Sequence, residues 1–320
     1  MTGPPAATAA VRLAVRRALA AVDGPVAAAV SGGADSLALA AALAFERPAA
    51  VALVVDHGLQ PGSAEVAARA AGQCRGLGLT PVVLAAPPTC PHPQHRSAVD
   101  ADTSGSRDGP EGDARAARYA ALDRAADERG LAAVLLGHTL DDQAETVLLG
   151  LARGSGARAL AGMAAVRGRY RRPLLGTTRA TTSAACAQAG LVPWSDPHND
   201  LAAYARVRVR TAVLPVLEEQ LGPGVAAALA RTAQQLRDDA DALDALTPDT
   251  GDVAELLALP AALRGRAVKR WAERACGRSV TAAHVEALRA LVEDWHGQGP
   301  VALPGGVRVR RDGPRLASAP

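Results

Sequence analysis

The fold class of this chain is decided by the stretch Ser31-Gly32-Gly33-Ala34-Asp35-Ser36. It directly follows the apolar run VAAAV at residues 26–30, which has the length and composition of a buried strand. Consecutive glycines let backbone N–H groups approach an anion, and a helix beginning after such a turn directs its positive dipole end at the same place. The stretch therefore predicts a phosphate site between a strand and a helix of an α/β fold.

Apolar runs and helical stretches alternate on both sides of this turn. Short apolar runs separated by helices are typical of βαβ units around a parallel sheet. Residues 87–110 are rich in Pro, Gly, Ser and Asp, and we expect a long loop there. The expected strands are residues 25–30, 49–55, 81–85 and 131–137, and the expected helices are 6–22, 34–45, a stretch from 63, 111–130 and 140–152.

The pattern becomes mostly helical after residue 194. Helices are expected at 201–220, 224–246, 260–275 and 281–293, followed by short β-like runs at 300–303 and 306–311. We therefore predict three parts: a Rossmann-like α/β nucleotide-binding domain over 1–217, a helical connector over 218–250, and a small α+β domain over 251–320.

The composition excludes several classes of protein. Of the 320 residues, 49% are hydrophobic and 21% are charged, which excludes a wholly disordered chain. No uncharged apolar run reaches the ~18 residues of a membrane span and no signal peptide follows Met1, so we expect a cytoplasmic protein. The four cysteines are scattered and form no CxxC pair. The basic residues are 34 Arg and one Lys, Lys269, which excludes a Walker-type nucleotide loop with its Gly-Lys-Ser/Thr motif.

A second polar cluster is expected at the end of the strand at 131–137. In the segment GHTLDDQAET (residues 137–146), Thr139 and Asp142 fit a capping box at a helix start. The spacing of His138, Asp142 and Glu145 predicts that all three share one helix face toward the nucleotide crevice. Adjacent carboxylates repel phosphate unless they serve a metal ion or a cationic substrate, so we favour a functional role over capping alone.

Two further motifs leave alternatives open. Asp56 and His57 end the second strand, where residues of open α/β sheets contact ligands, but a structural role for His57 is equally compatible. In the segment EGDARAARY (residues 111–119), Glu111, Arg115 and Arg118 share a helix face, as they would on a solvated, salt-bridged helix.

Arginine is concentrated in one region of the chain. Residues 151–180 contain seven arginines and no acid, although the whole chain has a net charge of only +3, and a shorter acid-free stretch follows at 206–210. Such a distribution is what a nucleic-acid backbone requires, with a solvated basic face as the alternative. The candidate contacts are Arg153, Arg158, Arg169, Arg171, Arg172, Arg206, Arg208 and Arg210.

Taken in order, these segments resemble the tRNA(Ile)-lysidine synthase family of the PP-loop ATP pyrophosphatase superfamily. The resemblance rests on SGGADS at 31–36, VDHGLQPGS at 55–63, EGDARAARY at 111–119, LGHTLDDQAETVLLGLARGSG at 136–156, LVPWSDPHND at 191–200 and YARVRVR at 204–210. It extends more weakly to LPAALRGRAVKRW at 259–271 and LPGGVRVRR at 303–311.

The resemblance implies an adenine nucleotide alpha-hydrolase-like fold and a tRNA-modifying ligase. ATP would adenylate the C2 oxygen of the first anticodon cytidine of tRNA(Ile) with a CAU anticodon, releasing pyrophosphate. The side-chain amine of free L-lysine would then attack C2 and displace AMP, which changes the codon and amino-acid specificity from Met to Ile. It also implies tRNA binding by the arginines named above, and a homodimer.

The resemblance assigns roles by matched position. Asp142 and Glu145 would bind lysine and act in catalysis with Asp35, Arg115, Arg118 and His138, and Asp35 would hold Mg²⁺. The residues implied in ATP binding are Ser31, Gly32, Gly33, Ala34, Asp35, Ser36, Asp56, His57, Gly137 and His138.

The chain departs from the family pattern in three places, one of which is the C-terminal part, where the length allows one small domain rather than two. Val207 stands where an Asn often follows Arg206, which removes one polar contact, and the loop over 87–110 is longer than usual. The rival functions are a PP-loop 2-thiolation enzyme acting on tRNA, a PP-loop synthetase for small molecules, and a tRNA-binding protein without catalysis. Isolated cysteines disfavour the first rival, the arginine-rich region the second, and the intact SGGADS and DDQAET segments the third.

Overall fold

The computed structural model of the chain describes residues 3–56, 58, 62–85, 110–195 and 204–319. These residues divide into two compact units, Met1–Arg237 and Asp238–Pro320, and each unit is described by itself. The division into parts over 1–217, 218–250 and 251–320 stays a prediction. The expected loop at 87–110 and His57 lie outside the described residues, apart from the start of a helix at Pro110.

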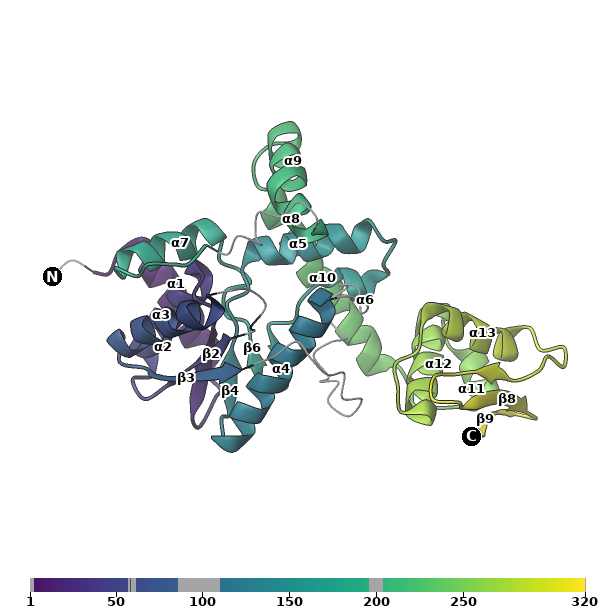
Figure 1. Cartoon of the computed structure of the whole chain (residues 1–320). Helices are drawn as coiled ribbons and strands as arrows, with labels where there is room; N and C mark the ends of the chain where they lie inside the picture. Colours follow the sequence, from purple (N-terminus) through teal and green to yellow (C-terminus); the bar gives the residue numbers. More distant parts are fainter. Residues whose placement is uncertain (1–2, 57, 59–61, 86–109, 196–203, 320) are drawn as a thin grey trace. The chain divides into compact units, whose positions relative to one another are not determined.

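A six-stranded sheet forms the centre of the first unit (Figure 1). The strand order is β3-β2-β1-β4-β6-β5, and every neighbouring pair is parallel except β5 and β6. This confirms the predicted Rossmann-like parallel sheet. The strands are β1 (Val26–Val30), β2 (Val51–Asp56), β3 (Thr80–Ala85), β4 (Ala133–Leu135), β5 (Val166–Arg167) and β6 (Tyr170–Arg171).

Helices cover both faces of this sheet, which explains why its strands are apolar runs. One face packs against α1 (Ala6–Leu19), α2 (Ala34–Glu46), α3 (Ser63–Gly76) and α7 (Arg179–Gln188). The other face packs against α4 (Pro110–Glu128). Successive residues of β1 point to opposite faces of the sheet. Ala28 packs in the core under α1, α2, α3 and α7, and Ala27 packs in the core under α4.

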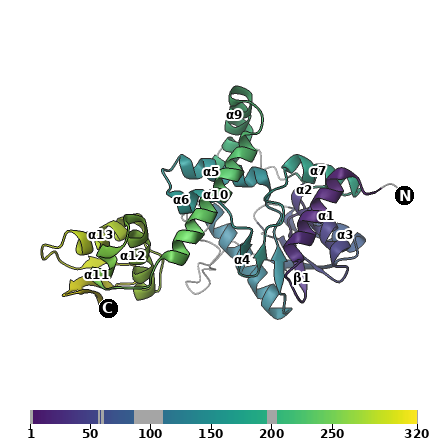
Figure 2. The same cartoon turned by 180° about the vertical axis from the view of Figure 1, so that it is seen from behind.

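The remaining helices of the first unit lie between β4 and β5 or after α7 in the sequence. Figure 2 shows α5 beside the beginning of α10, where Ala144 of α5 packs with Val209, Leu214 and Leu229. The helix expected at 201–220 is interrupted by a π-helical turn that includes Arg210. The elements are α5 (Leu140–Leu151), α6 (Ala157–Leu160), α8 (Ala205–Arg208), the π-helix η3 (Val209–Val213), α9 (Leu214–Leu221) and α10 (Val225–Leu246), and α10 continues into the second unit from Asp238 on.

The second unit has its own apolar core, formed between three helices and a small sheet. Leu256, Val268 and Leu288 lie in this core together with Val309 of the sheet. The antiparallel strand order β7-β8-β9 confirms the predicted α+β character. Among the described helices of the whole chain, none is both long and apolar enough to cross a bilayer. The elements are α11 (Val253–Ala258), α12 (Ala261–Cys276), α13 (Ala282–Glu293), β7 (Val301–Ala302), β8 (Arg308–Asp312) and β9 (Arg315–Ala319).

Candidate active site

The predicted phosphate turn lies between the end of β1 and the start of α2. Gly32 has a φ of +86°, which favours glycine. The hydroxyl oxygen of Ser36 accepts a hydrogen bond from the backbone N–H of Ser31 at 3.2 Å and donates to the Gly33 carbonyl at 2.9 Å. Gly33 is the N-cap of α2 and has no side chain to engage the first N–H groups of the helix. These groups are therefore available to an anion.

Gly137, at the end of the segment after β4, touches this turn. A Cβ atom at position 137 would lie 3.2 Å from both the backbone nitrogen and the Cα atom of Ser36. A larger residue would therefore push against the start of α2. The close approach gives a steric reason for glycine at a position predicted to contact ATP.

Helix α5 holds the two predicted lysine-binding carboxylates. Thr139 is its N-cap and forms the predicted capping box with Asp142, whose Oδ2 accepts hydrogen bonds from the Thr139 N–H at 2.8 Å and hydroxyl at 2.9 Å. Asp142 and Glu145 are buried on one face of the helix. The prediction that His138 shares this face is wrong, because α5 begins at Leu140 and His138 precedes even the N-cap.

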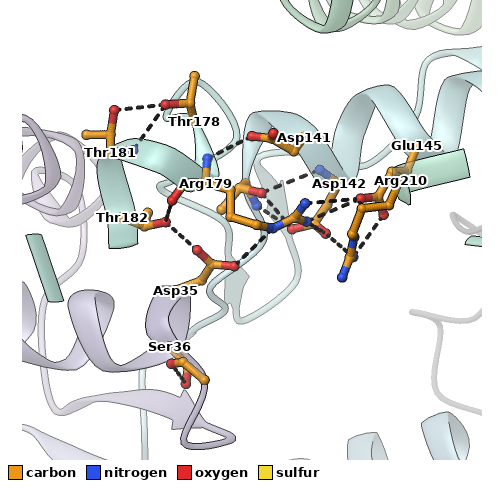
Figure 3. Close-up of polar contacts among 12 residues, drawn as sticks. Asp35, Ser36, Asp141, Asp142, Glu145, Thr178, Arg179, Thr181, Thr182 and Arg210 are labelled. Carbon is orange, nitrogen blue, oxygen red and sulfur yellow. Dashed lines mark hydrogen bonds and ion pairs between the residues drawn. The ribbon is translucent and has the colours of Figure 1, made fainter. Parts of the chain in front are cut away.

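Two arginines neutralise these carboxylates (Figure 3). Arg179 lies with its Nη2 atom 2.8 Å from Asp142 Oδ1 and 3.3 Å from Glu145 Oε1. Its Nε atom is 3.7 Å from Asp35 Oδ2 in the phosphate turn. Arg210 binds Glu145 in a bidentate manner, with Nε 2.7 Å from Oε1 and Nη2 3.1 Å from Oε2. One ionic cluster thus joins the phosphate turn, α5, α7 and the π-helical turn.

Burial and neighbouring charges shift the acidity of this cluster. Burial raises the pKa of Asp35, and the Asp142 carboxylate raises it further, against the hydroxyl of Thr182 and the Arg179 guanidinium. Burial would also raise the pKa of Asp142, but Arg179, His138 and the hydrogen bonds from Thr139 together lower it. Asp142 is therefore held as a carboxylate.

Further cationic groups lie near His138, and some of their buried donor atoms have no partner within the described residues. Arg172 is 2% exposed, and its Nε and Nη2 atoms have no hydrogen-bond partner among the described residues, nor does the buried Nε of Arg115. Burial, reinforced by the neighbouring cations Arg118, Arg206 and Arg172, lowers the pKa of Arg115 to about 10. Burial also lowers the pKa of His138 to about 3, with Arg172 and Arg115 acting in the same direction, so its imidazole is neutral.

The arginines predicted to bind tRNA occupy different environments. Arg153, Arg158 and Arg208 are exposed. Arg169 pairs with Asp127 at 2.6 Å, Arg171 donates to the Gly168 carbonyl, and Arg206 donates to the Thr146 hydroxyl at 3.4 Å. Arg172 and Arg210 depart from the expected surface, because Arg172 is buried and Arg210 binds Glu145. Val207, which replaces the family Asn, is buried.

A small hollow lies beside the phosphate turn, at the end of β2. Ser31, Asp56, Ser63 and Trp194 are among its lining residues. The Trp194 backbone N–H donates to the Gly32 carbonyl at 2.9 Å, so the segment after α7 is attached to the turn. Asp56 therefore lies next to the phosphate turn, and its contact with a nucleotide stays a prediction. His57 is outside the described residues.

Sequence reasoning did not identify two residues of the cluster. Arg179 was counted only within the arginine-rich region, and Thr182 was not singled out. Thr182 directs its hydroxyl to an Asp35 carboxylate oxygen, and the Arg179 backbone N–H donates to Asp141 Oδ2 at 2.7 Å. No local pattern in the sequence marks residues 179–188 as a helix, so neither residue carried a sequence signal that pointed to this cluster.

Comparisons with known proteins agree with this geometry. The PP-loop domain family matches residues 11–217, and the TilS substrate binding domain family matches residues 252–316. The tRNA(Ile)-lysidine synthase of Leifsonia xyli subsp. xyli is 56% identical over 89% of this chain and 86% of that protein. The tRNA(Ile)-lysidine synthase of Thermobifida fusca is 52% identical over 100% of both chains.

One solved structure supports the fold alone. The U34-tRNA thiolase NcsA from Methanococcus maripaludis is 18% identical and aligns with a TM-score of 0.57 over 72% of this chain and 79% of that chain. The matched PP-loop domain and relatives more than half identical over nearly the whole sequence establish that the chain belongs to the tRNA(Ile)-lysidine synthase family.

Proposed function

We propose that this protein ligates free L-lysine to C2 of the first anticodon cytidine of tRNA(Ile) with a CAU anticodon. ATP adenylates the cytidine, and lysine then displaces AMP. The modified tRNA reads an isoleucine codon, whereas the unmodified CAU anticodon reads the methionine codon. The observation that carries the proposal is the ionic cluster in which Asp35 of the phosphate turn lies beside the buried carboxylates of Asp142 and Glu145. An ATP site thus adjoins a site for a cationic amine.

In the first step, the turn at 31–36 binds the pyrophosphate portion of ATP. We assign the N–H groups at the start of α2 and the hydroxyls of Ser31 and Ser36 to the phosphates, and Asp56 to the adenosine. Asp35 in the phosphate turn would supply one carboxylate to Mg²⁺, and no group of three possible metal ligands occurs among the described residues. Phosphate oxygens and water would supply the other ligands. When bound, the ion neutralises phosphate charge.

The cationic groups around His138 suit the negative charge of the transferred phosphate. Arg172 and Arg115 carry buried donor atoms that have no hydrogen-bond partner in the part of the chain that the structure describes, and such groups are costly to bury without an anion. We assign Arg115, Arg118 and Arg172 to the α-phosphate and the adenylated base. His138 is neutral, so its imidazole can donate one hydrogen bond and accept another, and it adds no positive charge.

In the second step, lysine must be held as a cation and then deprotonated. Its side-chain amine has an ordinary pKa of ~10.4, so it arrives as an ammonium ion. The buried carboxylates of Asp142 and Glu145 bind this charge, and one of them accepts the proton as the amine attacks C2. AMP departs with the electron pair of the C2–O bond.

The exposed arginines of the first unit supply contacts to the tRNA backbone. Arg153, Arg158 and Arg208 are the accessible members of the arginine set, and the second unit matches a substrate binding domain of the same family. We further propose a cytoplasmic homodimer, which rests on the family resemblance. Sedimentation of the purified protein tests the dimer.

Lysine transfer to tRNA tests the proposed function. The protein is incubated with radiolabelled lysine, ATP, Mg²⁺ and transcripts of tRNA(Ile) carrying either a CAU anticodon or a GAU anticodon. We expect label in the CAU transcript alone, with AMP released in equal amount. Unlabelled tRNA in both reactions, or label without ATP, contradicts the proposal.

A further inference from the structure

Resting on the proposed function, we infer that Arg179 occupies the lysine site of the nucleotide-free enzyme and leaves it when ATP binds. Arg179 is thus a positioning residue that makes the lysine site conditional on ATP. The inference starts from the contacts of α5 with α7 and the π-helical turn (Figure 3).

Every carboxylate oxygen of the lysine site already accepts a hydrogen bond. Asp142 Oδ2 accepts two from Thr139, and Asp142 Oδ1 accepts one from Arg179 at 2.8 Å. Glu145 Oε1 accepts from Arg179 and Arg210, and Glu145 Oε2 accepts from Arg210. An arriving ammonium ion has three N–H donors and competes with these guanidinium groups for the remaining lone pairs of the carboxylate oxygens, so the departure of one guanidinium strengthens lysine binding.

The charge balance leads to the same conclusion. Three carboxylates, those of Asp35, Asp142 and Glu145, face the two guanidinium groups of Arg179 and Arg210. A single negative charge is left over, and Asp35 also accepts a hydrogen bond from the Thr182 hydroxyl. Lysine would therefore enter a site whose charge is largely neutralised, which weakens its binding.

Arg179, rather than Arg210, has the geometry to leave. Arg210 holds both oxygens of Glu145 at 2.7 and 3.1 Å, a bidentate pair. Arg179 contacts Glu145 at 3.3 Å and already extends to Asp35 in the phosphate turn at 3.7 Å. A triphosphate bound at the start of α2 adds several negative charges next to Asp35 and attracts the Arg179 guanidinium away from α5. Asp142 and Glu145 then become available to lysine.

Lysine binding with and without a nucleotide tests this inference. Equilibrium dialysis with labelled lysine is performed with and without α,β-methylene ATP, which cannot be cleaved between the α and β phosphates. For the unmodified protein we expect the analogue to tighten lysine binding by about tenfold or more, within the usual range of coupling between sites. For Arg179→Ala and Arg179→Gln we expect tight lysine binding without the analogue and a ratio near one. Arg16→Ala, which removes a surface ion pair with Glu46, should behave as the unmodified protein.

Steady-state kinetics separate this role from a general structural one. Arg179→Gln should raise the KM for ATP by about tenfold when ATP is varied. At saturating ATP it should change the KM for lysine by less than about twofold. The inference is overturned if the analogue does not tighten lysine binding to the unmodified protein. It is also overturned if the analogue tightens lysine binding to both Arg179 variants as much as to the unmodified protein. If the unmodified protein transfers lysine to tRNA in spite of either result, the proposed function stands and the role of Arg179 is wrong. If it transfers none, the proposed function itself fails.

Discussion

Replacing Glu145 by Gln removes the most buried charge of the ionic cluster while keeping the side-chain volume. The Glu145 side chain is 0% exposed and is contacted by Arg210 at 2.7 Å and Arg179 at 3.3 Å. Breaking a buried ion pair from one side costs about 3–5 kcal/mol. Both arginines are 27% exposed, and Asp142 remains 3.5 Å from Arg210, so water and Asp142 offset part of this cost. We expect a loss of about 2 kcal/mol in the free energy of unfolding.

Urea unfolding followed by circular dichroism measures this loss. For a domain of this size, about 2 kcal/mol also lowers the melting temperature by roughly 4–8 °C. Glu46→Gln is the matched control, because Glu46 pairs with the 61% exposed Arg16 and such surface pairs contribute about 0–1 kcal/mol. A double-mutant cycle with Arg210→Met should give a coupling energy of about 2 kcal/mol. If Glu145→Gln is no more destabilising than Glu46→Gln, the cluster does not stabilise the fold as argued.

Three further outcomes follow from the structure. The pKa of His138 is about 3 in the folded state and ~6.5 in the unfolded state, so only the unfolded state binds a proton between these pH values. The free energy of unfolding should therefore fall by up to ~1.4 kcal/mol for each pH unit below pH ~6.5. Urea titrations at several pH values measure this dependence, which should be shallower for His138→Asn. Gly137→Ala places a Cβ 3.2 Å from the Ser36 backbone. It should raise the KM for ATP by about tenfold in the lysine-transfer assay and leave the affinity for tRNA unchanged. An unaltered KM for ATP would show that the turn tolerates the methyl group. Arg153→Ala should reduce the slope of log binding constant against log salt for tRNA by about 0.7–0.9 in filter-binding experiments, whereas an unchanged slope would remove Arg153 from the interface.

The sheet was predictable because its signals are local. The runs around β1, β2, β3 and β4 are apolar and separated by helices, so their parallel arrangement followed from spacing alone. Strands β5 and β6 have two residues each, too few to show a pattern. Helix α7 is rich in Ala, Thr and Ser without a clear apolar stripe, so nothing local marked it as a helix.

The active site was predictable only where its residues lie within one motif. Asp142 and Glu145 were found because they share a helix turn, and Asp35 because it belongs to the phosphate turn. Arg179 and Arg210 are 34 and 65 residues away from Glu145, and only the packing of α7 and the π-helical turn brings them to it. Arginine-rich composition favoured a nucleic-acid contact for Arg210, whereas its position beside a buried carboxylate depends on tertiary structure.

The adenylated tRNA intermediate offers the most direct test of the proposed reaction. The protein is mixed with tRNA(Ile) carrying a CAU anticodon, Mg²⁺ and ATP labelled at the α-phosphate, and label on the tRNA is followed before and after lysine is added. The account predicts that the tRNA acquires label without lysine and releases it as AMP when lysine is added. A tRNA that never acquires the label, or one that keeps it after lysine is added, would contradict the account.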